Sequence, residues 1–527
     1  STMTKRTVSA SRVTAGLNAL NGQRPQRQSG LTGANAFIQA AKPVERTPVA
    51  HTWNGAISNA TTLSGLLDFF SVNLRGRTDI LRYWEKAKAD DKSLSRRLLF
   101  QTRDVRGGKG ERDVFRTILK HEALNDPAYV KPFIALVPEY GRWDDLWCLL
   151  ETSLKADVIQ LVKDQLMTDL NAAAEGKGVS GLAKWLPTEN AGKASSELAG
   201  KLAIWLNLAR SDYRKICSLL RQYLNIVERH MSNKEWGKIA YPGVPSRAMK
   251  LYRKAFGKHD QERFAKYLQA VLAGKTKINA ATVDPHEIMK AYNLTESSWV
   301  KRDAALEAQW ANLPKLNATR PIVAMCDTSG SMSSVCPAGC KSIDVALALT
   351  LYFAQQNKGE WAGLWFNFSE NAHLNRFNVR ESLINIVKGI SMSDWGQNTN
   401  FQAMFDTVLS WYDSGKITKN DIPAAFICFS DMQFDIAGGR NSKTNLQVVK
   451  AKFEKRGLVA PTLVFWNVAG ATDYPAVKDD SGVILLSGFN VAMFKAVMSM
   501  DVDKLRNITP AQAMLDTLLS PRYDAVA

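Results

Sequence analysis

Apolar residues recur with the period of an amphipathic helix from about Leu63 to Trp310. The spacing i, i+3, i+4 and i+7 is clearest in five segments: Ser93–Gln101, Val114–His121, Val158–Met167, Glu197–Ala209 and Tyr213–Arg229. Gly and Pro clusters at 107–110, 137–141 and 241–245 separate helical stretches. Helices of this length without strands between them predict an all-α helical-repeat domain, a HEAT-like solenoid or ring, over residues 56–315. No strict repeat is visible, so an irregular all-α bundle is the alternative.

The pattern changes near Leu313. Short apolar runs typical of buried strands follow, at Pro321–Cys326, Trp361–Phe368, Ala424–Phe429, Thr462–Val468 and Gly482–Leu486. Helical stretches lie between them, at Ser342–Gln356, Ser382–Lys388, Phe401–Trp411 and Thr444–Arg456. Strands that alternate with helices predict a Rossmann-like α/β domain with a mostly parallel sheet over residues 316–527. We expect a fragment that begins near Ala311 to be soluble.

Residues 1–55 differ in composition from the rest of the chain. They are rich in Ser, Thr, Gly, Gln and Arg and show weak periodicity. Such a composition favours a basic flexible arm over residues 1–55, with one short helix at Ala34–Ala41.

Positive charge is concentrated in the N-terminal part of the chain. The formal net charge is +18, yet residues 321–527 carry 18 Lys and Arg against 19 Asp and Glu, so residues 1–320 hold a net +19. A basic body of this size indicates a polyanionic partner, with nucleic acid first. The alternative is a soluble protein that is merely basic.

Cysteine content and hydropathy indicate the cellular compartment of the protein and whether it spans a membrane. Six cysteines in 527 residues are too sparse for a disulfide framework and favour a reducing, cytoplasmic compartment. Cys336 and Cys340 lack a second Cys or His pair nearby, so zinc is not expected. No run of about 18 apolar residues occurs, so no membrane span is expected.

Oxygen-bearing side chains follow three of the predicted elements of the α/β domain. Asp327, Ser329 and Ser331 come directly after the first strand, and Asp431 ends another strand. Thr399 lies in a loop that precedes a helix. Because ligands of open α/β sheets bind at the carboxyl ends of the strands, these groups are expected to converge there. Carboxylates and hydroxyls are hard ligands, so the sequence predicts a site for Mg²⁺ or another divalent cation.

This segment resembles a von Willebrand factor A domain with its metal-ion-dependent adhesion site. The resemblance implies that Ser329, Ser331 and Thr399 bind the metal directly or nearly so, while Asp327 and Asp431 act through water. It also implies an open coordination position that a carboxylate from a partner protein fills.

Three strings in the helical part combine Gly or Pro with cations: Arg103–Arg112, Tyr140–Leu146 and Tyr241–Tyr252. Backbone amides and cations of such turns can bind phosphate, and rings beside Arg can stack on unpaired bases. Tyr140 and Trp143 are more typical of core positions than of a stacking surface. The predicted RNA-binding residues are Arg103, Arg106, Lys109, Arg112, Arg142, Arg247 and Lys250.

The order of parts resembles the Ro (TROVE) ribonucleoprotein family and its bacterial and phage relatives, which join a ring of helical repeats to a von Willebrand A domain. The strings above and Pro285–Glu287 are most similar to an uncharacterised branch of this group. The resemblance implies a non-catalytic scaffold that binds small structured or single-stranded RNA and recruits a partner through its metal domain.

Other functions remain open or are disfavoured. A protein–protein adaptor that works with a MoxR-type AAA+ ATPase is the main alternative. No phosphate-loop motif occurs, and Pro187–Ala194 fails it at the first and last positions. The six histidines form no catalytic motif, and a hydroxyl-rich site is unlike the clustered carboxylates of two-metal nucleases. We therefore expect no enzymatic activity.

Overall fold

The computed structural model describes most of the chain from residue 49 onward. The described residues are 49–51, 57–224, 226–292, 301–316, 318–335, 339, 341–368, 373–390, 401–431, 442–469, 480–489 and 507–527. The helix expected at Ala34–Ala41 lies outside them. Val49–His51 form strand β1, which pairs antiparallel with β2 (Ile57–Asn59). The predicted free arm is therefore wrong for Val49–His51, because their backbone groups are hydrogen-bonded in a two-stranded sheet.

The first large part of the described chain is helical, as predicted. Its helices are α3 (Gly65–Ser71), α4 (Ile80–Asp90), α5 (Lys92–Arg103), α6 (Arg112–Asn125), α7 (Pro127–Val130), α8 (Val137–Tyr140), α9 (Lys155–Ala174), α10 (Leu182–Trp185), α11 (Lys193–Trp205), α12 (Arg210–Tyr223), α13 (Val227–Ser232), α14 (Ser246–His259), α15 (Gln261–Leu272), α16 (Pro285–Tyr292) and α17 (Ala304–Ala311). The single helix expected over Tyr213–Arg229 is wrong. Ile226 has an extended backbone and separates α12 from α13.

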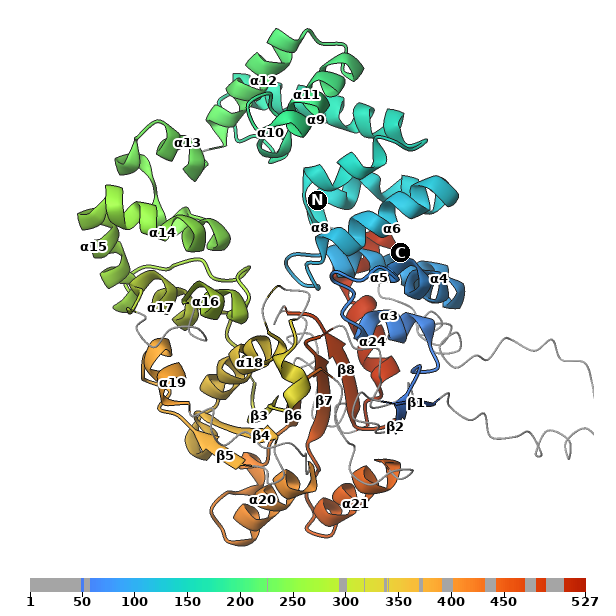
Figure 1. Cartoon of the computed structure of the whole chain (residues 1–527), viewed down its shortest axis with the longest axis vertical. Helices are drawn as coiled ribbons and strands as arrows, with labels where there is room; N and C mark the ends of the chain where they lie inside the picture. Colours follow the sequence, from blue (N-terminus) through green and yellow to red (C-terminus); the bar gives the residue numbers. More distant parts are fainter. Residues whose placement is uncertain are drawn as a thin grey trace, which may run out of the picture.

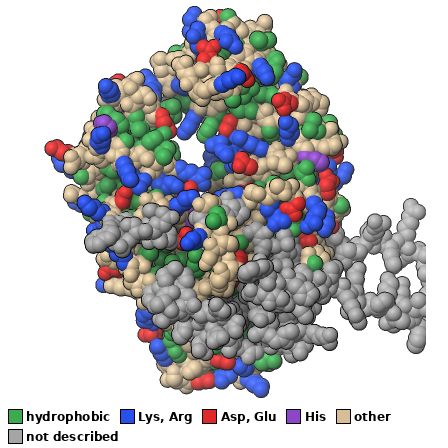
Figure 2. Space-filling view, in the orientation of Figure 1, with side chains coloured by type: hydrophobic (Ala, Val, Ile, Leu, Met, Phe, Trp, Pro, Cys, Tyr) green, Lys and Arg blue, Asp and Glu red, His purple; other side chains and the backbone are tan. Residues whose placement is uncertain are grey.

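These helices form a ring that closes on the α/β domain. The chain passes through α3–α8, then α9–α12, then α13–α15, and returns through α16 and α17 (Figure 1). Helix α16 packs against α18 (Ser342–Gln356) of the α/β domain. Figure 2 shows an opening through the molecule between the helices, with Lys and Arg side chains at its rim. Helices α8, α10, α14 and α16 border this opening (Figure 1).

A six-stranded sheet forms the C-terminal part and confirms the predicted α/β class. Its strands are β3 (Ile322–Asp327), β4 (Leu364–Phe368), β5 (His373–Arg376), β6 (Ala425–Ser430), β7 (Thr462–Asn467) and β8 (Val483–Ser487). Their order is β5-β4-β3-β6-β7-β8, parallel except for β5. The sequence pattern predicted each of the five parallel strands and missed the short antiparallel edge strand β5.

Strand residues alternate between the two faces of this sheet, and each face has its own core. Val323 and Met325 pack with α20 (Phe401–Asp413) and α21 (Ser442–Glu454). Ala324 and Cys326 belong to the other core, which includes α18. That second core continues without a break into the helices α3–α6, so one hydrophobic cluster spans both parts of the chain.

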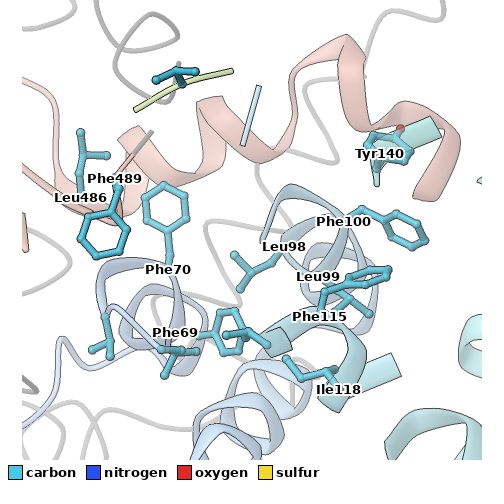
Figure 3. Close-up of a cluster of buried hydrophobic side chains, with 14 of the residues drawn as sticks. Phe69, Phe70, Leu98, Leu99, Phe100, Phe115, Ile118, Tyr140, Leu486 and Phe489 are labelled. Atoms are coloured by element: carbon cyan, nitrogen blue, oxygen red, sulfur yellow. The ribbon is translucent and has the colours of Figure 1, made fainter. Parts of the chain in front are cut away.

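The last residues of the chain return to the first helices. Helix α24 (Pro510–Leu518) contacts α3, α5 and β8, and the 3-10 helix η8 (Pro521–Val526) contacts α5. In Figure 3, Phe70 of α3 lies beside Leu486 of β8 and beside Phe489, which follows that strand. A fragment that begins near Ala311 would expose this apolar surface to water. The expectation of a soluble, independent C-terminal fragment is therefore not supported by the structure.

Candidate functional site: a metal site and a cationic surface

The predicted metal residues lie at the switch point of the sheet. Strands β3 and β6 are parallel neighbours, and the connections that leave them run to opposite sides of the sheet. Asp327 is the last residue of β3, and Asp431 directly follows β6. The carboxyl ends of two such strands form a crevice between their loops. The tertiary structure thus brings Asp327 and Asp431 to the same edge, although 104 positions separate them in the sequence.

Asp327 is buried and held by hydrogen bonds. Its Oδ2 accepts a hydrogen bond of 2.5 Å from Ser430 Oγ, and its Oδ1 accepts one of 2.9 Å from the Ser329 backbone N–H. Burial raises the pKa of the Asp327 carboxyl, and the hydrogen bonds from Ser430 and Ser329 oppose that shift. No Lys or Arg forms an ion pair with Asp327 among the residues that the structure describes. A buried carboxylate without such a partner would be stabilised by a bound cation.

The hydroxyl groups of Ser329 and Ser331 complete the described part of the site. Their Oγ atoms are 3.1 Å apart, and both side chains are half-buried at the start of the 3-10 helix η5 (Gly330–Ser333). Two hydroxyls beside two carboxylates form an all-oxygen set suited to a magnesium-sized ion. Thr399 lies outside the described residues. The sequence interpretation gave Ser430 no role, although it stood in the string Phe429–Asp431 that marked the strand end.

Two of the predicted RNA-binding cations are buried, and that part of the prediction is wrong. The Arg103 side chain is 3% exposed, and its Nε donates a hydrogen bond of 2.7 Å to Asp145. Gly141 leaves room for this pair, because a Cβ there would lie 2.7 Å from Arg103 Nε. Lys109 is also buried, and its ammonium donates to Phe70 O and to Ser487 Oγ. Both cations therefore serve the packing of the protein and cannot reach an external phosphate.

The same glycine-rich string also docks the C-terminus. Asp104 accepts two hydrogen bonds of 2.8 Å from Arg522, and Tyr140 donates one of 2.6 Å to the Arg522 carbonyl. Tyr140 is buried, which agrees with a core position, whereas Trp143 is half-buried. Part of the string that indicated phosphate binding therefore contacts the C-terminal residues of the chain and holds them against the first helices.

The other five predicted cations remain accessible to different extents. The side chains of Arg106, Arg112 and Arg247 are 64%, 47% and 65% exposed. Each of these three lies near an acidic neighbour: Arg106 pairs with Glu139 at 3.0 Å, Arg112 with Asp113 at 3.0 Å, and Arg247 with Glu287 at 3.7 Å. Exposed pairs of this kind are weak and can be exchanged for a phosphate.

Arg142 and Lys250 are less accessible, with 28% and 22% exposed side chains. Lys250 pairs with Glu287 at 3.0 Å. The Arg142 guanidinium binds Asp144 and lies over the Trp185 ring, 4.0 Å from its centroid. Lys184 is 5.5 Å from the same ring. A half-buried ring beside two cations is a feature that single-strand binding proteins use for base stacking, and the sequence interpretation missed Trp185.

Among the described residues, no helix combines the length and the apolar character needed to cross a membrane.

The fold and the site define a chain with a ring of helices joined to an α/β domain that carries oxygen-bearing side chains at its switch point. Residues 179–316 match the model of a domain of unknown function, DUF2828, and residues 321–515 match that of a second, DUF7788. An uncharacterized protein of Acanthamoeba polyphaga mimivirus is 28% identical over 499 residues, covering 86% of this chain and 85% of the viral protein. A crystal structure of the Ro (RSR) protein of Deinococcus radiodurans aligns with a TM-score of 0.46 and 15% identity, over 86% of this chain and 100% of that one.

Proposed function

We propose that this protein is a non-catalytic RNA-binding scaffold whose α/β domain holds Mg²⁺ and recruits a partner. The observation that carries the RNA proposal is the opening through the helical ring, which Lys and Arg side chains border (Figure 2). A strand of RNA carries one negative charge per nucleotide, and a cationic passage can follow its backbone. The net +19 of residues 1–320 supports a polyanionic ligand for the same part of the chain.

Base stacking supplies the second element of this proposal. Arg142 and Lys184 flank Trp185, and α10, which carries Lys184 and Trp185, borders the opening (Figure 1). Stacking on an aromatic ring does not depend on base identity, so it suits a scaffold that accepts several single-stranded sequences. The exposed arginines Arg106, Arg112 and Arg247 would supply phosphate contacts.

The RNA proposal predicts a change in salt dependence. Replacing Arg106, Arg112 and Arg247 by alanine should weaken the binding of a single-stranded RNA and flatten the log–log salt slope by about 2, since each phosphate contact contributes roughly 0.7. The measurement is a fluorescence-anisotropy titration at several salt concentrations. A control with Lys358, Lys419 and Lys455 replaced by alanine removes three exposed charges from the α/β domain and should keep the wild-type slope.

Two results would contradict the RNA proposal. If both triple variants flatten the slope equally, RNA responds only to the overall charge of the molecule and not to the proposed surface. If wild-type protein binds neither single-stranded nor hairpin RNA, the adaptor function with an AAA+ ATPase takes its place.

The metal proposal rests on Asp327, Asp431, Ser329 and Ser331 at the switch point. Mg²⁺ bound there would supply an open coordination position for a carboxylate of the partner, as the resemblance to von Willebrand A domains implies. In the chain itself, Ser430 and the Ser329 backbone hold the Asp327 carboxylate in one orientation. Such orientation by neighbouring groups is what an outer-sphere ligand requires.

We expect Asp327→Asn to weaken metal binding by about 10–100-fold, the usual cost of losing an outer-sphere carboxylate. Asparagine keeps the shape of the buried side chain, so the protein should remain folded. Binding is measured by calorimetry with Mg²⁺ and by the electron paramagnetic resonance of Mn²⁺. Asp413→Asn, an exposed aspartate of the same domain paired with Arg456, is the matched control. Equal affinities for wild type and Asp327→Asn would remove this carboxylate from the site.

A further inference from the structure

A second hollow lies where the ring meets the α/β domain, away from the carboxyl ends of the strands. Its volume is about 630 Å³. Leu272 of α15 and Trp310 of α17 line one side of it. Gln355 of α18 and Ser382, which directly precedes α19 (Leu383–Gly389), line the other side. Small-molecule sites have volumes of roughly 300–1,000 Å³ and often lie between domains. The hollow is therefore large enough for a ligand that contacts both parts of the chain.

The charged lining of this hollow is mainly cationic. Arg302, Lys315, Arg380 and Lys388 line it. Arg302, Lys315 and Arg380 are exposed, and within the described part of the chain their side chains form no hydrogen bond and no ion pair within 4 Å. Most arginines of the ring are instead paired with carboxylates, as Arg75 is with Glu111 and Arg253 with Asp303. Three cations that line this one hollow therefore lack such a partner.

The lining holds fewer acidic than basic residues. Glu307 is buried, and its carboxylate accepts hydrogen bonds from the backbone N–H groups of Leu383 and Ile384 at 2.8 and 3.1 Å. It also accepts one of 2.8 Å from the Tyr292 hydroxyl. Its oxygens thus accept hydrogen bonds within the protein, and the other carboxylate of the lining, Glu381, stands against Arg302, Lys315 and Arg380. An anion with more than one charge would balance the lining.

We propose that this hollow binds a small, multiply charged phosphate compound, and that this site is separate from the metal site and from the proposed RNA surface. The guanidinium groups of Arg302 and Arg380 and the ammonium group of Lys315 suit oxygens of neighbouring phosphate groups, because arginine binds phosphate through paired N–H donors and lysine binds it as a compact charge. Arg302 precedes α17, Lys315 lies in the segment between α17 and β3, and Arg380 precedes α19. A bound phosphate compound would therefore tie the ring to the α/β domain.

The test uses inorganic pyrophosphate as the probe and the full-length protein. We expect calorimetry to detect its binding to wild type and thermal denaturation to show stabilisation, since a ligand that binds only the folded state raises its stability. Replacing Arg302, Lys315 and Arg380 together by glutamine should weaken binding about 1,000-fold, at roughly tenfold for each of the three charged groups removed. Circular dichroism checks that the variant is folded, and Lys315→Gln alone provides a milder change.

The matched control removes the same charge elsewhere. Lys163, Lys201 and Lys215 are exposed on α9, α11 and α12, across the ring from the hollow, and replacing them by glutamine should leave pyrophosphate binding unchanged (Figure 1). The proposal is overturned if wild type does not bind pyrophosphate at millimolar concentration, or if both triple variants bind it equally. Displacement of pyrophosphate by a single-stranded RNA would also overturn it, because the hollow would then belong to the RNA surface.

Discussion

Replacing Arg103 by alanine should lower the free energy of unfolding by about 3 kcal/mol, although Arg103 stands in a glycine-rich string that looks like a phosphate-binding turn. The Arg103–Asp145 ion pair is buried, with exposed side-chain fractions of 3% and 0%. Removing one partner of a buried pair costs roughly 3–5 kcal/mol because the other charge loses its compensation. The lower end applies here, because Asp145 keeps a contact of 2.7 Å with Arg116.

Arg106→Ala is the control for this prediction, since Arg106 lies in the same string. Its pair with Glu139 is exposed on both sides, and such pairs contribute about 0–1 kcal/mol. Urea denaturation followed by tryptophan fluorescence measures both variants. The structural assignment fails if the two substitutions cost the same, or if Arg103→Ala abolishes RNA binding at unchanged stability.

The largest pH effect should come from Lys109. Burial lowers the pKa of this ammonium to about 7 in the folded protein, while the charge of Glu111 opposes the shift. In the unfolded chain a lysine pKa is about 10.4, so the unfolded state binds more protons between pH 7 and 10. The contribution of Lys109 to the free energy of unfolding must therefore rise with pH across this window, by at most about 1.4 kcal/mol per pH unit.

Comparison with Lys109→Met isolates this contribution, because all other groups titrate in both proteins. Between pH 7.5 and 9.5 the wild type should gain about 2 kcal/mol of unfolding free energy relative to the variant. Below pH 7 the difference should become constant, since the group is then protonated in both states. A difference that does not change between pH 7.5 and 9.5 would contradict the lowered pKa. The result matters for the architecture, because Lys109 joins the end of α3 to Ser487 at the end of β8.

The candidate metal site shows how much can be predicted from local patterns in the sequence. Asp327 and Asp431 each end a short apolar run, and the carboxyl ends of parallel strands meet at one edge of a sheet. Knowing the strands was therefore enough to predict that the two carboxylates converge. The hydrogen bond from Ser430 to Asp327 was not predictable in the same way, because it depends on the pairing register of β3 with β6.

The cations of the helical part show where such patterns fail. Arg103, Arg106 and Lys109 occupy one short string, yet the first and third are buried and the second is exposed. A turn has no periodicity from which an inward and an outward side can be derived. Only the elements that pack against the string, Asp145 for Arg103 and Ser487 for Lys109, decide which cation remains in water.

By itself, the sequence determined the two kinds of fold in this chain and the oxygen-bearing side chains at the sheet edge, because the apolar periodicities of helices and strands are local and do not depend on any tertiary contact. The tertiary structure alone decided that the ring closes on the sheet and that the C-terminus returns to the first helices. Arg522 reaches Asp104 across 418 positions, and no local pattern encodes a contact of that range. It also decided which charges face solvent, since burial depends on partners that fold from distant parts of the chain.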